Sequence, residues 1–351
     1  MFSGLGLVPL VLIFAVAAGA VWVAGINLSR STDTLDVRLG IGEALGGAIL
    51  LAIATNLPEI AITASAAVSH SLGIAIGNIL GGIAIQTVVL VVLDIAIGKE
   101  AALTTRAASL ILGLEGLLVI LVLAISVMGA QLPGGALFAR IEPAALVIAA
   151  FWVAGLWLVN NARKGLPWHD TTGSAPGSQE KPMGHSKGTA LKEKSLARAG
   201  SIFGAAAAVT LGAGIVLEQS GEEIAGHIGM TGVVFGATIL AAATALPEVS
   251  TGIAAVRLGD YQLAVSDIFG GNAFLPVLFL VAGLLSGSAV LPQAQATDIY
   301  LTALGIVLTV VYLWGLVTRP NRVVLRMGLD SIAVLVLYAV GITGLIAVSN
   351  S

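Results

Sequence analysis

Ten apolar stretches, each about as long as a helix that crosses a membrane, dominate this sequence. They lie near residues 5–26, 42–68, 73–97, 107–129, 141–161, 199–218, 231–257, 261–285, 297–317 and 328–348. A membrane-spanning helix needs about 20 apolar residues. Only 10% of the residues are charged, against about 25% in a soluble domain. The sequence therefore predicts an all-α polytopic membrane protein of about ten helices, surrounded by the lipid bilayer.

Lys and Arg are distributed unevenly between the loops that join these stretches. Fifteen of the 16 follow an odd-numbered stretch, and only Arg140 follows an even-numbered one. Cytoplasmic loops carry an excess of Lys and Arg. We therefore expect an integral protein of the cell membrane with both chain ends outside and segment 163–198 in the cytoplasm. This segment is rich in Gly, Pro, Ser and Lys, a composition typical of a disordered linker.

The sequence also repeats itself with a shift of 189 residues. The shift places GAILLAIATNLPE (47–59) on GATILAAATALPE (236–248), with nine of 13 positions identical, and NILGG (78–82) on DIFGG (267–271). We predict two five-helix repeats, residues 1–162 and 199–351, joined by the linker. Because five is an odd number, the second repeat is inverted in the membrane. Inverted repeats with matching interrupted helices indicate a transporter binding site between them.

Each repeat carries a proline in the middle of an apolar stretch. Pro58 and Pro247 have no N–H, so the carbonyls four residues earlier, those of Ala54 and Ala243, lose their helical donors. Freed carbonyls at membrane depth persist only where they are buried in protein or line a cavity. The sequence therefore predicts a broken helix with available carbonyl oxygens in each repeat.

Side-chain oxygens flank both prolines: Glu59 and Glu248 follow them, and Thr55 and Thr244 precede them. A charged residue at mid-membrane costs at least about 2.5 kcal/mol, so a matched pair of glutamates indicates a function. Calcium takes six to eight oxygen ligands. We predict that these four side chains and the freed carbonyls bind a cation. Without the cation the carboxylates repel, and one is expected to hold a proton.

Further polar residues and glycines are expected around this site. The predicted hairpins place Gly82 level with Glu59, and Gly271 level with Glu248. We expect polar side chains to surround the site or line the path to it: Asn56, Asn78, Gln86 and Asp267. We expect glycine pairs to let helix backbones approach closely there: Gly81, Gly82, Gly270 and Gly271.

The motifs ATNLPE with GNILGG, and ATALPE with SDIFGG, resemble the two alpha repeats of the calcium/cation antiporter superfamily, which includes sodium/calcium exchangers. The resemblance implies alternating access, with the ion site built from the second, third, seventh and eighth helices. By position, it assigns the calcium-binding glutamates of the family to Glu59 and Glu248, and its threonine ligands to Thr55 and Thr244.

The sequence departs from this family pattern where sodium ligands are expected. The family usually has serine where this chain has Asn56 and Ala245. Its sodium-coupled members also have serine where this chain has Gly82 and Gly271. Sodium-coupled members have Asn or Asp where this chain has Gln86 and Leu275, and Asp267 replaces a usual asparagine. The glutamate pair is kept while several expected sodium ligands are missing, so proton coupling stands beside sodium coupling.

We therefore predict a secondary cation antiporter, not an enzyme, that exchanges Ca2+ for Na+ or H+. The alternatives are an H+-coupled exchanger of another cation, an ion channel, or a non-transporting member of the fold. The sequence has no P-loop and no motif for an organic cofactor, so an ion gradient is the expected energy source. Inorganic cations and lipid are the expected partners, with no nucleic acid and no obligatory protein partner.

Overall fold

The computed structural model describes residues 2–39, 52–99, 101–107, 109–133, 140–164, 196–320 and 322–350. Within these ranges, eight helices are long and apolar enough to cross a membrane, and a bent pair, 232–244 with 246–257, makes a ninth. The predicted stretch 42–68 lies partly outside the described residues. Its described end includes the short apolar helix α3 (Leu57–Val68). The prediction of a polytopic all-α membrane protein is confirmed.

The long unbroken helices are α1 (Leu7–Leu39), α4 (Leu72–Ile97), α6 (Leu110–Ala130), α7 (Pro143–Lys164), α8 (Leu196–Ile228), α14 (Ala296–Thr318) and α15 (Leu329–Ser349). The bent pair consists of α9 (Gly232–Phe235), the π-helical turn η1 (Gly236–Leu240), α10 (Ala241–Thr244) and α11 (Leu246–Arg257). The next membrane segment consists of α12 (Tyr261–Phe274), the 3-10 turn η2 (Leu275–Val277) and α13 (Leu278–Ser286).

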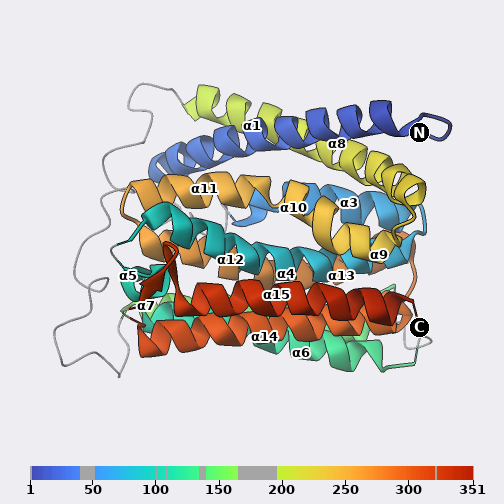
Figure 1. Cartoon of the computed structure of the whole chain (residues 1–351). Coiled ribbons are helices and arrows are strands. Elements are labelled where there is room, and N and C mark those ends of the chain that lie inside the picture. The colour runs from blue at the N-terminus through green and yellow to red at the C-terminus, as the bar shows by residue number, and fades with distance from the viewer. Residues whose placement is uncertain are drawn as a thin grey trace.

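Helix bounds repeat with the same shift as the sequence. A shift of 189 residues carries the bounds of α1 onto those of α8, those of α3 onto α11, and those of α4 onto the segment from α12 to α13. In Figure 1, α1 begins at the end of the bundle where both chain termini lie, and α8 begins at the opposite end. Equivalent helices of the two halves therefore run in opposite directions, as an inverted repeat requires.

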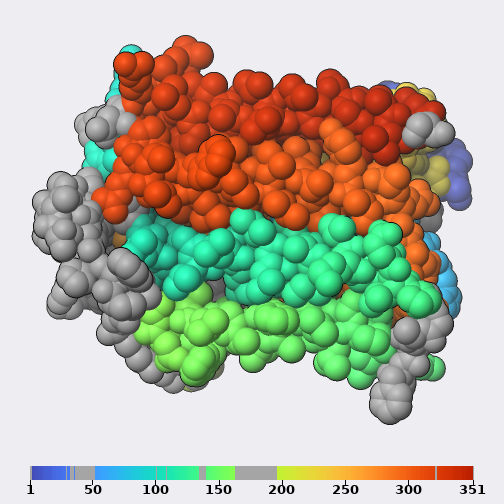
Figure 2. Space-filling view, turned by 90° about the horizontal axis from the view of Figure 1, so that it is seen from below, coloured from blue at the N-terminus to red at the C-terminus, as the bar shows by residue number. Residues whose placement is uncertain are grey.

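The helices form a layered bundle with α4 inside it. Figure 1 shows α1 and α8 together along one face. Figure 2 shows α15, α14, α6 and α7 side by side on another. The most apolar 18 residues of α4 are 72% buried, against 22% in α1, α8 and α15. The outer helices present their apolar side chains to the surface, as a lipid environment requires, and α4 contacts both repeats.

Several features differ from the sequence prediction. Helices α1 and α8 each have 33 residues and are longer than the predicted stretches. Residues 196–198 of the predicted linker are helical, α7 continues to Lys164, and segment 165–195 lies outside the described residues. The structure adds three small elements that no apolar stretch predicted: α5 (Leu103–Ala107), the 3-10 turn η3 (Leu291–Gln293), and a hairpin of β1 (Val323–Val324) and β2 (Met327–Gly328).

Asp94, near the end of α4, joins two of these small elements. Its Oδ1 accepts a hydrogen bond from Leu103 N at 2.7 Å, and its Oδ2 accepts one from Gly328 N at 2.6 Å. The side chain is only 1% exposed. Two backbone donors therefore compensate for the burial of this carboxylate, and the carboxylate fixes α5 and the hairpin against α4.

Glycines at equivalent positions let α1 and α8 lie against the prolines of the opposite repeat. A Cβ on Gly25 of α1 would lie 2.8 Å from Cα of Pro247. A Cβ on Gly214 of α8 would lie 3.2 Å from the carbonyl oxygen of Pro58. The 189-residue shift carries Gly25 onto Gly214. The backbone of each long helix thus contacts the start of the broken helix in the other half, as small residues permit between membrane helices.

We predict that Gly25→Ala destabilises the protein by about 1–3 kcal/mol, the usual cost of overpacking, because the added carbon meets the Pro247 backbone. Gly19→Ala, on the same helix, is the matched control, since an added Cβ there meets nothing within 4 Å. The measurement is the midpoint of thermal unfolding of the purified protein in detergent. Equal midpoints for the two variants would show that the contact at Gly25 is not tight.

Candidate cation-binding site

Both repeats interrupt a membrane helix directly before the Leu-Pro-Glu motif. The breaks fall at Asn56 (φ −84°, ψ 13°) and Ala245 (φ −78°, ψ 3°), outside the helical range, and α3 and α11 begin one residue later. Each new helix has its proline in the first two positions, where the missing N–H costs no helical hydrogen bond. In the second repeat the two parts meet at 44°. Ala54 and Ala243, next to the breaks, are buried.

The two glutamates that follow these breaks meet at the interface between the repeats. Glu59 and Glu248 are both fully buried. Gln86 of α4 lies between them and donates through Nε2 to Glu59 Oε1 at 3.5 Å and to Glu248 Oε1 at 3.3 Å. The same nitrogen donates to Asn56 Oδ1 at 3.0 Å. One side-chain amide therefore joins carboxylates that are far apart in the sequence.

The threonines before the breaks contact the glutamates crosswise. The hydroxyl of Thr244 lies close to Glu59, and that of Thr55 lies close to Glu248. Each hydroxyl also lies near the carbonyl three residues earlier, at 3.2 Å for Thr55 and Ala52, and at 3.1 Å for Thr244 and Ala241. Each glutamate is thus contacted by the threonine of the other repeat, so the site exists only when the two repeats are packed together.

Four buried oxygens around this pair accept no hydrogen bond from the described residues. They are Glu59 Oε2, Glu248 Oε2, Gln86 Oε1 and Asn272 Oδ1. A buried acceptor without a donor is costly, and hard cations bind carboxylate and amide oxygens. No third Asp, Glu, Cys or His joins the cluster within the part of the chain that the structure describes. The two carboxylates match the charge of one divalent cation, and the Asp267 carboxylate lies near enough to Glu248 to repel its charge.

Asn78 and Asp267 flank the two glutamates in the same way. Asn78 Nδ2 donates to the carbonyl oxygen of Glu59 at 3.2 Å and to Thr63 Oγ1 at 3.3 Å. Thr251 Oγ1 lies 2.7 Å from Asp267 Oδ2 and 3.1 Å from the carbonyl oxygen of Glu248. Both residues contact the broken helix of their own repeat rather than the carboxylates, so they lie beside the glutamate pair.

Comparison with known protein families assigns this chain to one of them. The sequence pattern of the family described as "Sodium/calcium exchanger protein" matches residues 9–160 and 199–347, which is most of the chain. The chain belongs to the sodium/calcium exchanger family. The members of this family are ion exchangers rather than enzymes.

Two curated proteins resemble this exchanger in sequence. The inner membrane protein YrbG of Escherichia coli (strain K12) is 26% identical over 290 residues, covering 81% of this chain and 82% of YrbG. The putative antiporter CaxA of Alkalimonas amylolytica is 32% identical over 89 residues, covering 25% of this chain and 28% of CaxA. YrbG matches over most of its length, whereas CaxA matches one segment.

Two solved structures share the fold of this exchanger. The sodium-calcium exchanger NCX_Mj, soaked with Na+ and Sr2+, aligns with a TM-score of 0.62 at 17% identity, over 96% of this chain and 99% of that one. The H+/Ca2+ exchanger CAX aligns with a TM-score of 0.66 at 12% identity, over 97% and 87%. At such identities the likeness extends to the fold, and the chemistry must be argued from the residues of this exchanger.

The glycines of this exchanger lie where its own side chains fill the space beside the site. A Cβ on Gly271 would lie 2.7 Å from Asn56 Nδ2, and one on Gly82 would lie 3.4 Å from Leu275 Cδ1. A Cβ on Gly81 would lie 2.9 Å from the backbone of Ala237 in the other repeat. The nearest described atom for Gly270 is Ala52 Cβ at 3.8 Å, an ordinary contact. A serine at Gly271 would therefore compete with Asn56 for room, whereas a Cβ at Gly82 would only make an ordinary contact with Leu275.

Sequence reasoning missed two polar residues beside the site and two glycines. Asn272 and Thr87 are fully buried, and Asn272 Nδ2 donates to Thr87 Oγ1 at 3.0 Å. Asn272 could have been predicted, because a polar residue directly after Gly270-Gly271 is unusual in an apolar stretch. Gly25 and Gly214 could have been found because they share the 189-residue shift of the motifs.

We predict that Gly271→Ala destabilises this exchanger by about 1–3 kcal/mol through overpacking. Asn56 cannot move aside freely, since Nδ2 donates to Ala52 O at 2.7 Å and Oδ1 accepts from Gln86. Adding Asn56→Ala should relieve the clash, so the double variant should be more stable than the sum of the single effects implies. Thermal unfolding midpoints of the three variants provide the measurement, and additive effects would contradict the proposed contact.

Proposed function

We propose that this protein is a secondary antiporter that carries Ca2+ across the membrane in exchange for a counter-ion. The observation that carries the proposal is the meeting of Glu59 and Glu248 at the repeat interface, bridged by Gln86. The bound ion would take the place of the Gln86 amide and contact the carboxylate oxygens itself. The hydroxyls of Thr55 and Thr244 lie close to these oxygens. The carbonyls of Ala54 and Ala243, which precede the prolines by four residues, would complete the shell.

Packing of α1 and α8 supports alternating access as the transport mechanism. Helix α1 packs against α11, and α8 packs against α3, so each contacts the broken helix of the opposite repeat. The tight contacts at Gly25 and Gly214 lie at the prolines of these helices. A shift of the α1–α8 pair along the broken helices would therefore change access to the glutamates from the two ends of the bundle. Rigid movement of one part of an inverted repeat against the other is a common transport mechanism.

Among the possible counter-ions, the packing favours H+ over Na+. The positions that carry serine in sodium-coupled relatives are glycines here, and the Leu275 methyl and the Asn56 amide lie beside them. Additional sodium sites would lack the serine hydroxyls at both positions, and at Gly271 they would also lack room. Two carboxylates close enough to share one amide repel when both are ionised, so protons are the counter-ions that they can bind without further ligands.

The distribution of charge supports an orientation with both termini outside and the central segment in the cytoplasm of a cell membrane. By sequence, only Arg140 lies in a loop at one end of the predicted helices, and the other 15 Lys and Arg residues lie in loops at the opposite end. The positive-inside rule assigns that end to the cytoplasm. In this orientation the exchanger would export Ca2+ against an inward movement of protons.

We expect Glu59→Gln and Glu248→Gln each to reduce Ca2+ transport into proteoliposomes at least about tenfold, because each removes one of two charges that match the ion. Glu115→Gln is the matched control, since Glu115 is a buried glutamate of α6 outside the site. It should retain transport. Unchanged transport in both site variants would refute the proposed site. Ca2+ movement without any counter-ion on the opposite side would identify a channel.

For the counter-ion, we expect an imposed pH gradient to drive Ca2+ uptake and an imposed Na+ gradient to have little effect. A protonophore should abolish the uptake. Uptake driven by Na+ would show that the exchanger is sodium-coupled. If neither gradient drives Ca2+, the same assay with other divalent cations distinguishes an exchanger of another ion from a non-transporting member of the family.

A further inference from the structure

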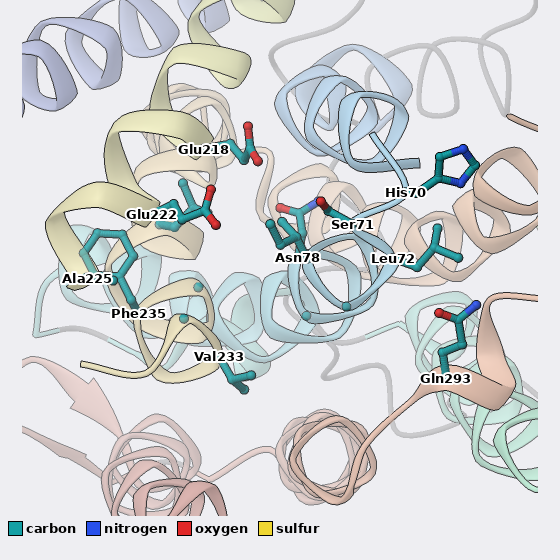
Figure 3. A pocket seen from close by; sticks show the side chains of 16 residues that line it. His70, Ser71, Leu72, Asn78, Glu218, Glu222, Ala225, Val233, Phe235 and Gln293 are labelled. Carbon is teal, nitrogen blue, oxygen red and sulfur yellow. The ribbon is translucent and has the colours of Figure 1, made fainter. Parts of the chain in front are cut away.

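A cavity of about 500 Å³ opens at the end of the bundle where both termini lie. Its wall is formed by the end of α8, the start of the bent pair, and the turn that leads into α4. Figure 3 shows Glu218 and Glu222 on α8 at one side of this space, with Ser71 and Asn78 facing them. The cavity thus presents two carboxylates opposite polar groups of the first repeat.

The two glutamates are one helical turn apart and both line the cavity. Glu222 is exposed, whereas Glu218 is only 8% exposed. Across the described residues, the Glu218 carboxylate accepts no hydrogen bond. A glutamate that is more than nine-tenths buried and accepts no hydrogen bond is costly to keep ionised, and its carboxylate oxygens can be reached from the cavity. A cation in the cavity would compensate for this cost.

The cavity shares a wall with the proposed transport site. Asn78 lines the cavity, and its Nδ2 donates to the carbonyl oxygen of Glu59 at 3.2 Å. The cavity therefore reaches, through Asn78, the backbone of the broken helix that carries Glu59.

The size and charge of the cavity suit a hydrated divalent cation. A water molecule takes about 30 Å³, and Ca2+ binds six to eight oxygens, so the cavity has room for the ion with most of its hydration shell. Like-charged groups in a cleft with low-dielectric walls concentrate counter-ions and raise their association rates about tenfold or more.

We propose that Glu218 and Glu222 form an entrance site that captures a hydrated divalent cation before it reaches Glu59 and Glu248. As a step in transport, this role rests on the proposed antiport function. The 189-residue shift places Ser29 at the position of Glu218 and Asp33 at the position of Glu222, so the equivalent positions of α1 carry one acidic residue instead of two. The complete pair is therefore not repeated on α1.

The first test compares Ca2+ transport by the Glu218→Gln/Glu222→Gln variant with that by Glu223→Gln. Glu223 is the neighbouring glutamate of α8 and does not line the cavity. The double variant should raise the KM for Ca2+ about tenfold at low ionic strength, and much less at high ionic strength, with little change in maximal rate. Glu223→Gln should behave like the native protein. A KM that does not change, or a loss of maximal rate alone, would overturn the capture role.

The second test measures binding of radioactive Ca2+ to purified protein by equilibrium dialysis and does not require transport. In a Glu59→Gln/Glu248→Gln background we expect a residual, weaker site. Adding Glu218→Gln/Glu222→Gln should abolish it, and adding Glu223→Gln should not. Residual binding that survives the entrance variants, or its absence from the Glu59→Gln/Glu248→Gln protein, would overturn the entrance site. Failure of the antiport proposal would instead appear as absent transport by the native protein.

Discussion

Two carboxylates buried at the interface between the repeats are the constraint around which this exchanger is built. Glu59 and Glu248 come from helices 189 residues apart, and the amide of Gln86 contacts both. Such a pair is unfavourable in a membrane unless donors or a cation compensate for it. The helix breaks at Asn56 and Ala245 follow from this need, because they bring hydroxyls and backbone oxygens to the same depth.

Equivalent contacts pack the two repeats around the glutamate pair, one from the first repeat to the second and one from the second to the first. Thr244 contacts Glu59 and Thr55 contacts Glu248, while α1 lies on α11 and α8 lies on α3. Such paired contacts are what the proposed alternating access requires, because equivalent surfaces would meet when the two halves exchange roles. The two halves are not identical, since Asn56 in the first stands where Ala245 stands in the second.

The long helices and the two helix breaks could be predicted because both depend on local patterns, whereas the cation site itself stays a prediction. An apolar stretch of spanning length indicates a membrane helix directly. A glutamate inside such a stretch is energetically costly, so a repeated Pro-Glu pair indicates a function. The ends of α1 and α8 were missed because their last turns carry polar residues, which hydropathy assigns to loops. The hairpin of β1 and β2 and the short α5 were missed because their docking depends on Asp94, which lies elsewhere in the sequence.

The sequence by itself determined the membrane class, the repeat, its inversion and the residues placed at the interface, since these follow from hydropathy, charge counts and a fixed shift. Only the tertiary structure decided which side chains meet. That Gln86 lies between both glutamates, that Asn272 joins Thr87, and that Asn56 fills the space beside Gly271 are contacts between distant segments. Such contacts depend on how helices rotate and tilt against one another, and neither hydropathy nor spacing specifies rotation or tilt.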